Sequence, residues 1–392
     1  MAEPFKNLIN AATVAQMAVH LQRAWPAFAR ARFEKQASTG LEALELKARM
    51  LHITDALEAT LPPDFSHAAA VIEASLAPPL PIDARGEPVS ASVKDDDAPK
   101  GAGPGAGISG WAVWPLGEFV VRRGLADVPR ALDCLHALTQ RFTAEFAIRP
   151  FIQQSPELVF STLQRWVRDP SAHVRRLVSE GSRPRLPWGL RLQALVADPS
   201  PTLPLLRALQ DDPSAYVRRS VANHLNDIAK DHPETVARWV VEHQPGASAH
   251  RLALLRHASR GLLRQGHAPT LAAWGLGKGL QGKAGLRLDA ASAAIGEFIT
   301  LEASITSTSR QAQKLEIDYA VHHVRANGTA SAKVFKGWKL TLAAGESRAL
   351  NKRHSLREVT TRRLYPGAHR VDLVINGRPE AHAAFELLPA PA

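Results

Sequence analysis

Two residues of the chain stand at a spacing that suits chemistry on a cation. Trp114 and Glu118 are four positions apart, so on a helix they lie one turn apart on the same face. An electron-rich indole ring attracts cations, and a carboxylate held near a developing positive charge stabilises it. The plainer interpretation is a core tryptophan beside a solvated glutamate, which is the commoner arrangement on helices. The two residues alone leave both interpretations open.

A second pair with this spacing is Glu145 and Arg149, in the run EFAIRPF. They form either an ordinary helical salt bridge, worth about 0.3–0.5 kcal/mol, or a site in which Arg149 holds a phosphate or the catalytic carboxylate. Glu180 could orient nearby arginines. Trp188 lies in RPRLPWG, a segment broken by prolines that ends in glycine. An aromatic ring in such a segment more often touches a ligand than fills a core, so we expect Trp188 to contact the ligand.

Cationic and amide side chains gather between residues 175 and 230, which predicts a surface that binds the phosphates of a polyanion. We expect about half of the arginines to touch the polyanion, with one arginine of each Arg-Arg pair held instead by an aspartate of the repeat. The candidates are Arg175, Arg176, Arg183, Arg185, Arg218, Arg219, Asn223, Asn226 and Lys230, followed by Arg260 and, near the C-terminus, Lys333 and Lys336.

The composition supports a polyanion as the partner. The net charge is +11, and the excess of cations lies wholly after residue 139. Nucleic acid is the first candidate, and simple solubility is the alternative. The single cysteine, Cys134, excludes an intrachain disulfide and suits a reducing compartment. The N-terminus lacks a signal-peptide pattern, and no apolar run is long enough to span a bilayer. We therefore expect no membrane partner.

One phrase of the chain occurs twice. Asp169–Ser171 and Val174–Arg176 return further on as Asp212–Ser214 and Val217–Arg219. A period of about 40 residues carried by apolar helical segments is the signature of two-helix solenoid repeats of the HEAT kind. Aspartate can cap a helix, and proline suits its first turn. The apolar positions at helical spacing should face the core, and the Arg-Arg pairs should point outward. These apolar positions are Val174, Leu177, Val178, Val217 and Val221.

Helical periodicity extends on both sides of these repeats. We therefore expect residues 1–277 to form one helical repeat domain that is interrupted by a loop. Residues 78–107 contain the run DDDAPKGAGPGAG and show no apolar period. Such a composition predicts an exposed and mobile loop.

Beyond a glycine-rich hinge at 275–285 the pattern changes. Seven short segments of alternating apolar and polar residues follow, separated by turns such as Asn327-Gly328. They predict an antiparallel sandwich of the immunoglobulin type over residues 278–392. The expected fold class is therefore an α-solenoid of HEAT-like repeats followed by an immunoglobulin-like β-sandwich.

Several longer runs resemble the DNA alkylation repair family of HEAT-like glycosylases, in its AlkC branch with a C-terminal immunoglobulin-like domain. The runs are EFAIRPF, VRRLVSEGSRPRLPWGLRL, YVRRSVANHLNDIAKDHP, DYAVHHV and KVFKGWKL. The resemblance covers nearly the whole chain outside 78–107. It implies a DNA N-glycosylase, a hydrolase that excises cationic N3-alkylated bases, chiefly 3-methyladenine and 3-methylcytosine, from duplex DNA in base excision repair. It also implies excision without base flipping, and no metal or nucleotide cofactor.

The resemblance gives the singled-out residues their roles. An N3-alkylated base is already positively charged before it leaves, so no general acid need protonate it, and the remaining work is to stabilise an oxocarbenium-like sugar and to align a water. In the similar AlkD-like proteins a tryptophan and an acid one turn apart do this work. Trp114 and Glu118 stand at that spacing, with glutamate in place of aspartate. Arg149, Glu145 and Trp188 are then expected near the lesion-bearing nucleotide.

Two alternatives remain. One is a non-catalytic HEAT-repeat module that binds damaged DNA or a protein partner, and the other is RNA binding, for which the sandwich lacks a stacking-platform signature. The chain contains no CxxC, HExxH or glycine-rich phosphate loop, so the sequence gives no support for a metal or a nucleotide. We expect a monomer in a bacterial-type cytoplasm that works on duplex DNA at the nucleoid.

Overall fold

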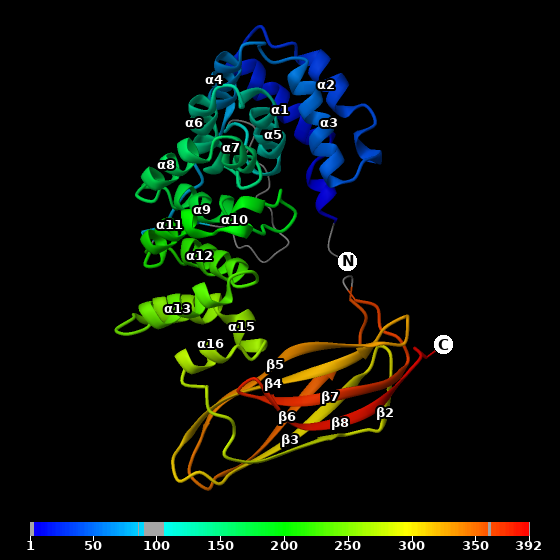
Figure 1. The fold of residues 1–392 in the computed structure, drawn as a ribbon. Helices are drawn as coiled ribbons and strands as arrows, with labels where there is room; N and C mark the ends of the chain where they lie inside the picture. The colour runs from blue at the N-terminus through cyan, green and yellow to red at the C-terminus, as the bar shows by residue number, and fades with distance from the viewer. Residues whose placement is uncertain (1–3, 85, 90–105, 360–361, 392) are drawn as a thin grey trace. The chain divides into compact units, whose positions relative to one another are not determined.

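The computed structural model describes residues 4–84, 86–89, 106–359 and 362–391 (Figure 1). The chain divides into two compact units, which we call unit 1 and unit 2. Unit 1 comprises Met1–Asp231 with Ser248–Ala258, and unit 2 comprises His232–Ala247 with Ser259–Ala392. Most of the predicted mobile loop at 78–107, namely residues 85 and 90–105, lies outside the described residues.

Unit 1 is helical, as the sequence predicts. Its α-helices are α1 (Ala11–Ala24), α2 (Arg30–Ser38), α3 (Leu46–Glu58), α4 (Phe65–Ser75), α5 (Val113–Gly124), α6 (Val128–Thr139), α7 (Ile148–Gln154), α8 (Pro156–Trp166), α9 (Ala172–Gly181), α10 (Gln193–Ala197), α11 (Leu203–Leu209), α12 (Ala215–Ile228) and α14 (Ala249–Ala258). Short 3-10 helices join them at Phe5–Leu8, Leu41–Ala43, Gly110–Ala112 and Ser200–Thr202. Equivalent helices contact their counterparts in the next repeat: α3 contacts α5, α9 contacts α12, and α12 contacts α14. This neighbour-to-neighbour stacking is typical of a solenoid.

The repeated Asp-Pro-Ser phrase begins α9 and α12. The side chains of Asp169 and Asp212 accept hydrogen bonds from the backbone amides of Ser171 and Ser214, at 2.8 and 2.9 Å. Each aspartate thus turns the chain into the helix that follows. The predicted apolar face is confirmed, because all five of its members are fully buried: Val174, Leu177, Val178, Val217 and Val221.

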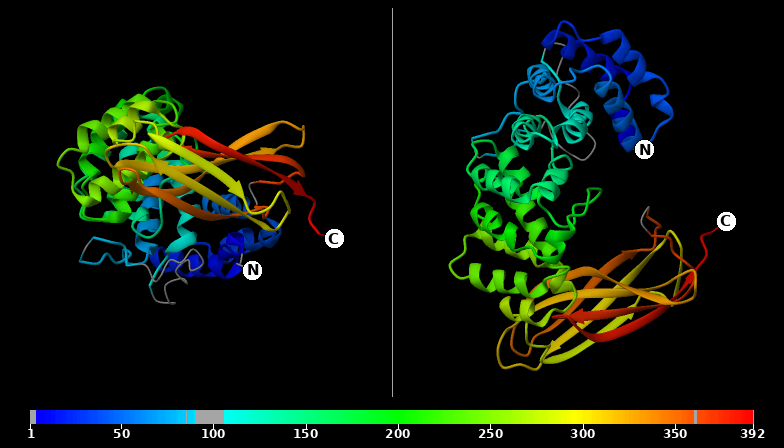
Figure 2. Two further views of the ribbon diagram at one scale, coloured as in Figure 1. Left: turned by 90° about the horizontal axis from the view of Figure 1, so that it is seen from below. Right: turned by 45° about the horizontal axis from the view of Figure 1, so that its top comes forward.

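Unit 2 contains three helices and eight strands within the described residues. The helices are α13 (Pro233–His243), α15 (Arg260–Arg264) and α16 (Ala268–Ala273). The strands are β1 (Gly282–Leu288), β2 (Ser292–Ala294), β3 (Phe298–Ser307), β4 (Gln313–Val324), β5 (Ala330–Leu342), β6 (Ser347–Ser355), β7 (Gly367–Ile375) and β8 (Arg378–Leu388). They form two sheets with the orders β1-β3-β6 and β2-β8-β7-β4-β5 (Figures 1 and 2).

The alternation of the strands explains the two sheets. In β3, for example, Ile299, Leu301, Ala303 and Ile305 are buried, whereas the residues between them are more exposed. These side chains share one core with apolar residues of β4 and β7. All seven predicted strands are present. The observed order of the domains, helices first and the β-sheet domain after them, is also the predicted one. The sequence pattern misses β2, which has three residues and pairs in parallel with β8.

Three imidazoles are buried in this sandwich: His323 on β4, His354 on β6 and His369 on β7. The Arg362 guanidinium donates to His323 Nε2 at 3.0 Å, and the Tyr319 hydroxyl lies 3.1 Å from His354 Nδ1. Burial, reinforced by repulsion from Arg362, lowers the pKa of His323 to about 3 and that of His354 to about 4. Both imidazoles are therefore neutral in the folded protein at neutral pH.

The stability of the sandwich should fall as the pH drops below about 6.5, because the unfolded chain then binds protons that the folded sandwich rejects. Each imidazole contributes up to about 1.4 kcal/mol per pH unit between its unfolded and folded pKa values. Hydrogen exchange of β4 and β7 amides, corrected for intrinsic rates, measures this loss. In His354→Phe the loss should be smaller, whereas the exposed-site control His382→Gln should behave as the wild type. An equally steep loss in His354→Phe would contradict this account.

Candidate nucleic-acid interface

The helix α5 carries both residues of the first predicted pair. Trp114 is half-buried, and its ring centre lies 5.9 Å from that of Trp111 and 5.8 Å from that of Phe146. A methyl group placed on Gly117 would lie 3.3 Å from the Ala147 side chain, so glycine lets α5 approach the turn before α7. Trp111 and Phe146 therefore hold the Trp114 ring in place, and part of this ring is accessible to solvent.

Glu118, one turn further along α5, belongs to a cluster of carboxylates around one guanidinium. Its carboxylate lies 3.5 Å from Arg122 Nε, and Arg122 also contacts Asp55 and Glu58 of α3, at 2.6 and 2.7 Å. Burial opposes the charge of Arg122, but the hydrogen bonds and charges of Asp55 and Glu58 outweigh it and raise the pKa of Arg122. We call Asp55, Glu58, Glu118 and Arg122 the acidic cluster.

The acidic cluster holds three carboxylates against one arginine, so it is negative within a chain whose net charge is +11. Sequence reasoning finds Glu118 and misses Asp55 and Glu58. The only local signal is Arg122, four positions after Glu118. The α3 carboxylates are more than 60 positions away, and only the packing of α3 on α5 brings them to Arg122.

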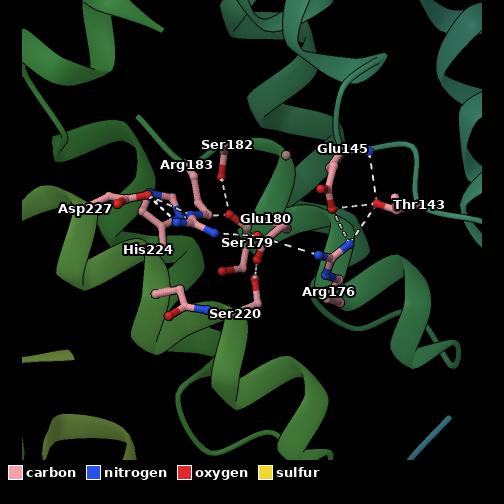
Figure 3. Close-up of polar contacts among 12 residues, drawn as sticks. Thr143, Glu145, Arg176, Ser179, Glu180, Ser182, Arg183, Ser220, His224 and Asp227 are labelled. Carbon is pink, nitrogen blue, oxygen red and sulfur yellow. Dashed lines mark hydrogen bonds and ion pairs between the residues drawn. The ribbon is translucent and has the colours of Figure 1, made fainter. Parts of the chain in front are cut away.

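A helical salt bridge between Glu145 and Arg149, one of the two interpretations of this pair, does not form. Because α7 begins at Ile148, Glu145 lies in the preceding turn and the two residues do not share a helical face. Glu145 instead pairs with Arg176 of α9 at 2.5 Å and accepts a hydrogen bond from the Thr143 hydroxyl at 2.7 Å. Glu145 therefore ties the turn before α7 to α9 (Figure 3).

Glu180 continues this network, as Figure 3 shows. It accepts a hydrogen bond from Arg183 at 2.5 Å and another from the Ser220 hydroxyl at 2.6 Å, and it lies 3.6 Å from Arg176. Burial opposes ionisation of Glu180, but the two guanidinium groups and Ser220 hold its pKa below the usual range. The prediction that Glu180 orients neighbouring arginines is thus confirmed.

The network ends on α12. Arg183 donates to the buried carboxylate of Asp227 at 2.7 Å, and Lys230 contacts the other oxygen of Asp227 at 2.8 Å. Beside them the fully buried His224 contacts the Ser179 carbonyl at 2.8 Å, and burial lowers the pKa of His224 to about 4. We call the chain from Glu145 through Arg176, Glu180 and Arg183 to Asp227 the ion network.

Arg149 is fully buried and holds the loop that follows α9. It donates to the carbonyl groups of Leu190, Gly181 and Arg183, at 2.5, 2.8 and 2.8 Å. Gly181 ends α9, so its carbonyl lacks a helical partner and Arg149 supplies one. Burial, together with the charge of Arg183, lowers the pKa of Arg149 to about 10, and the side chain is still charged at neutral pH.

This anchored loop presents Trp188 to solvent. The side chain is 84% exposed, and its backbone has a φ of 62°, in the left-handed region that a bulky residue rarely adopts. Such a conformation costs on the order of 1–3 kcal/mol and persists only where the surroundings enforce it. Arg149 enforces it from below the loop, where a methyl group placed on the neighbouring Gly189 would lie 3.4 Å from the guanidinium Nε. An exposed aromatic ring on a fixed loop is a ready contact for a nucleotide.

The prediction that the arginines of each pair point outward is wrong for Arg175 and Arg176, whereas the prediction that a repeat aspartate holds one of them is confirmed for Arg175. Arg175 is 9% exposed and forms two hydrogen bonds with Asp212 of the next repeat, at 2.6 and 3.1 Å. It also donates to the carbonyls of Asp169 and Pro170, which precede its own helix, at 2.8 and 3.0 Å. Arg218 repeats this contact with the carbonyls of Asp212 and Pro213. One arginine of each pair therefore stabilises the turn between repeats.

The other predicted cations and amides differ in exposure. Arg185 pairs with Asp231 through two contacts of 2.6 Å, and the Asn223 amide lies 2.9 Å from His257. Asn226 on α12 and Arg260 on α15 are half-buried. The exposed cations are Arg219 and Lys230 on α12 and, in unit 2, Lys333 and Lys336 on β5.

The described residues give two further results. None of their helices is both long and apolar enough to cross a bilayer. Their histidines, cysteines and carboxylates nowhere gather in a group of three that could hold a metal ion.

Comparisons with known proteins bear on the whole chain. Residues 283–389 match the family model described as the C-terminal Ig-like domain of the uncharacterised protein YhaZ. The uncharacterized protein YhaZ of Bacillus subtilis (strain 168) is 34% identical over 97% of this chain and 99% of its own. The solved structure of the Pseudomonas fluorescens alkylpurine DNA glycosylase AlkC, bound to DNA containing an abasic site analogue, is also 34% identical. It matches with a TM-score of 0.85 over 98% of this chain and 100% of that one.

The chain belongs to the AlkC family. The resemblance seen in the sequence is thereby confirmed, as is the predicted order of a helical region and an immunoglobulin-like domain. The ion network joins the turn before α7 to α9 and α12, and Arg149 fixes the loop that carries Trp188.

The loop that presents Trp188 should lose its order when Arg149 is changed to lysine, because one ammonium group cannot reach three carbonyls. Hydrogen exchange at Gly189 and Leu192, whose amides donate within the loop, should accelerate roughly tenfold or more. Arg141→Lys is the matched control, since Arg141 also donates to backbone carbonyls but at another place. Unchanged exchange in Arg149→Lys would show that the loop keeps its conformation without the hydrogen bonds from Arg149.

Proposed function

We propose that this AlkC protein excises the cationic N3-alkylated bases 3-methyladenine and 3-methylcytosine from duplex DNA in base excision repair, without flipping the base. Membership in the AlkC family supports a DNA glycosylase, because the Pseudomonas fluorescens relative is an alkylpurine DNA glycosylase and was solved with abasic DNA. The single observation that carries the substrate class is the acidic cluster, a negative site on a basic protein.

The acidic cluster suits the chemistry of such a lesion. The alkylated base leaves as a neutral molecule from a cationic nucleotide, so positive charge moves onto the sugar during bond cleavage and no proton donor is needed. A carboxylate about 4 Å from that charge interacts with it by about 4 kcal/mol at an effective dielectric constant of about 20. Since each ~1.4 kcal/mol of transition-state stabilisation is a factor of ten, one carboxylate can carry much of the acceleration.

Within the cluster the residues take different roles. Glu118 lies furthest from Arg122, at 3.5 Å against 2.6 and 2.7 Å for Asp55 and Glu58. Its charge is therefore the least neutralised, and we assign it the position beside the sugar. Trp114, one turn earlier on α5, offers its ring face to the cationic nucleotide. Trp188 supports the nucleotide from the anchored loop, which Arg149 fixes without itself reaching the surface.

The exposed cations bind the DNA phosphates. Buried arginines that already contact carboxylates release few counterions when DNA binds, so they add little to the salt-dependent affinity. Arg219 and Lys230 on α12 are exposed and are our candidates for phosphate contacts in unit 1. Such contacts position a protein without reading sequence, as a search for lesions requires.

The sandwich supplies a second set of cations, and we propose that it clamps the DNA. Lys333 and Lys336 are exposed on β5, the edge strand of its sheet. The adjacent edge strand β6 adds Lys352, whose ammonium lies 5.9 Å from the Trp338 ring, and Arg353, which lies 4.1 Å from the Phe298 ring. Cations gathered along these two sheet edges suit contacts with phosphates.

Replacing Glu118 with glutamine should lower the single-turnover release of 3-methyladenine from methylated duplex by at least about tenfold, because the charge beside the sugar is lost. Affinity for an abasic-site duplex should change little. Glu34→Gln, which alters a helical ion pair on α2, is the control and should excise normally. Normal excision by Glu118→Gln would remove this residue from the active site. DNA binding by a wild type that releases no base would favour the non-catalytic alternative.

Reversing the charge on β5 should weaken binding to damaged and undamaged duplex alike. The variant Lys333→Glu with Lys336→Glu loses phosphate contacts, so its affinity should fall roughly tenfold or more, and its salt dependence should become shallower. Lys283→Glu, an exposed change on β1 of the other sheet, serves as the comparison. Equal affinities of the β5 and β1 variants would exclude the β5 edge as part of the clamp.

A further inference from the structure

The chain between α4 and α5 contacts helices far beyond these two. We call residues 76–84 and 86–89 the strap. The strap begins beside Ile108, which lies just before α5. The Ala77 amide donates to the Ile108 carbonyl at 3.0 Å, and the Ile108 amide donates to the Ser75 carbonyl at 2.9 Å. Gly107 has a φ of 109° and lies against the backbone of Leu76, where a side chain would not fit.

From this base the strap passes the end of α6 and the start of α9. Arg141, just after α6, donates to the Ala77 carbonyl at 2.7 Å, and the Leu80 amide donates to the Gln140 carbonyl at 2.9 Å. The backbone of Leu80 also forms a hydrogen bond with His173 in the first turn of α9. The strap therefore touches two repeats before it reaches its far end.

The far end is a tight turn that directs Glu87. The Asp83 carboxylate accepts from the Glu87 amide at 2.9 Å, and the Asp83 carbonyl accepts from the Gly86 amide at 2.9 Å. The Val89 amide donates to the Pro81 carbonyl at 2.8 Å and closes the turn. Gly86 has a φ of 76°, which glycine adopts without strain.

The Glu87 carboxylate reaches the first turn of α12. It accepts hydrogen bonds from the backbone amides of Ala215 and Tyr216, the latter at 3.2 Å, and from the Ser214 hydroxyl at 3.2 Å. Ser214 occupies the capping position of α12 but makes no capping bond with its own side chain. The amides of a first helical turn lack partners within the helix, and a negative charge there is favoured by the helix dipole. Glu87 is thus the cap of a helix that begins more than 120 positions later in the chain.

We propose that Glu87 is a positioning residue for excision, which closes the strap over α6, α9 and α12 and fixes the angles between their repeats. Repeats of a solenoid contact only their neighbours, so their relative angles are soft unless something bridges several of them. These repeats carry the ion network and the loop of Trp188, and α5 with the acidic cluster packs on α6. The inference rests on the proposed function, because positioning is measured here through base excision.

The test is chemical rescue of Glu87→Ala, in the full chain. At a temperature well below unfolding and with enzyme in excess, its single-turnover release of 3-methyladenine should fall roughly fivefold or more, and α12 first-turn amides should exchange faster by a similar factor. Sodium formate should restore much of the rate relative to sodium chloride of equal concentration, because formate can occupy the vacated cap. Neither the wild type nor Glu34→Ala should respond to formate. A residue that only stabilises the fold would not show this anion dependence at low temperature.

Several outcomes would overturn the inference. One is normal excision by Glu87→Ala, and another is slow excision that formate does not improve while α12 exchanges as in the wild type. Should Glu87→Ala fail to fold, Glu87→Gln keeps the shape of the cap without its charge, and an unaltered excision rate and α12 exchange in that variant would equally overturn it. If the wild type itself releases no base, the proposed function fails. The exchange of α12 in Glu87→Ala then still shows whether the strap caps the helix.

Discussion

The structure of unit 1 depends on charges that are buried in opposite pairs between repeats. An unpaired charge in a protein interior costs several kcal/mol, whereas a paired one fixes the position of both partners. The ion network alternates acid and base from Glu145 to Asp227, and Arg175 meets Asp212 in the same way. The ion network therefore joins the turn before α7 to α9 and α12. Arg149 connects the network to the loop of Trp188, since it binds the carbonyl of Arg183, whose side chain belongs to the network.

Much of the fold was predictable, because local patterns determine it. The repeated Asp-Pro-Ser phrase begins two equivalent helices, the valine stripe is buried, and the alternating segments form the strands of the sandwich. The sequence indicated that a repeat aspartate holds one arginine of each pair, as Asp212 holds Arg175. The partners of the other charged residues were not predictable, because they lie on other repeats, and nothing near Arg122 indicates Asp55. The failure at Glu145 and Arg149 has a similar cause, since four-residue spacing has meaning only where both residues are helical.

Two kinds of charged surface among the described residues are available to DNA, apart from the buried ion pairs. One is the acidic cluster on α3 and α5, where three carboxylates outnumber one guanidinium. The other consists of exposed cations, such as Arg219 and the lysines of β5. A basic exterior attracts DNA of any sequence, and a small negative site discriminates in favour of a cationic nucleotide within it. Selectivity for alkylated bases then needs no pocket that encloses the base, as the proposed excision from the stacked duplex requires.

We propose that the buried repeat arginines hold the solenoid and do not neutralise phosphates. The test is the salt dependence of duplex binding for Arg175→Gln combined with Asp212→Asn, a change that keeps the net charge and the approximate shape. Each phosphate contact contributes about 0.9 to the slope of log K against log salt concentration. We expect a slope equal to that of the wild type, with a lower unfolding temperature, because the buried pair stabilises the fold and binds no phosphate. A slope that is shallower by about 0.9 would show that Arg175 binds a phosphate, and would contradict the claim.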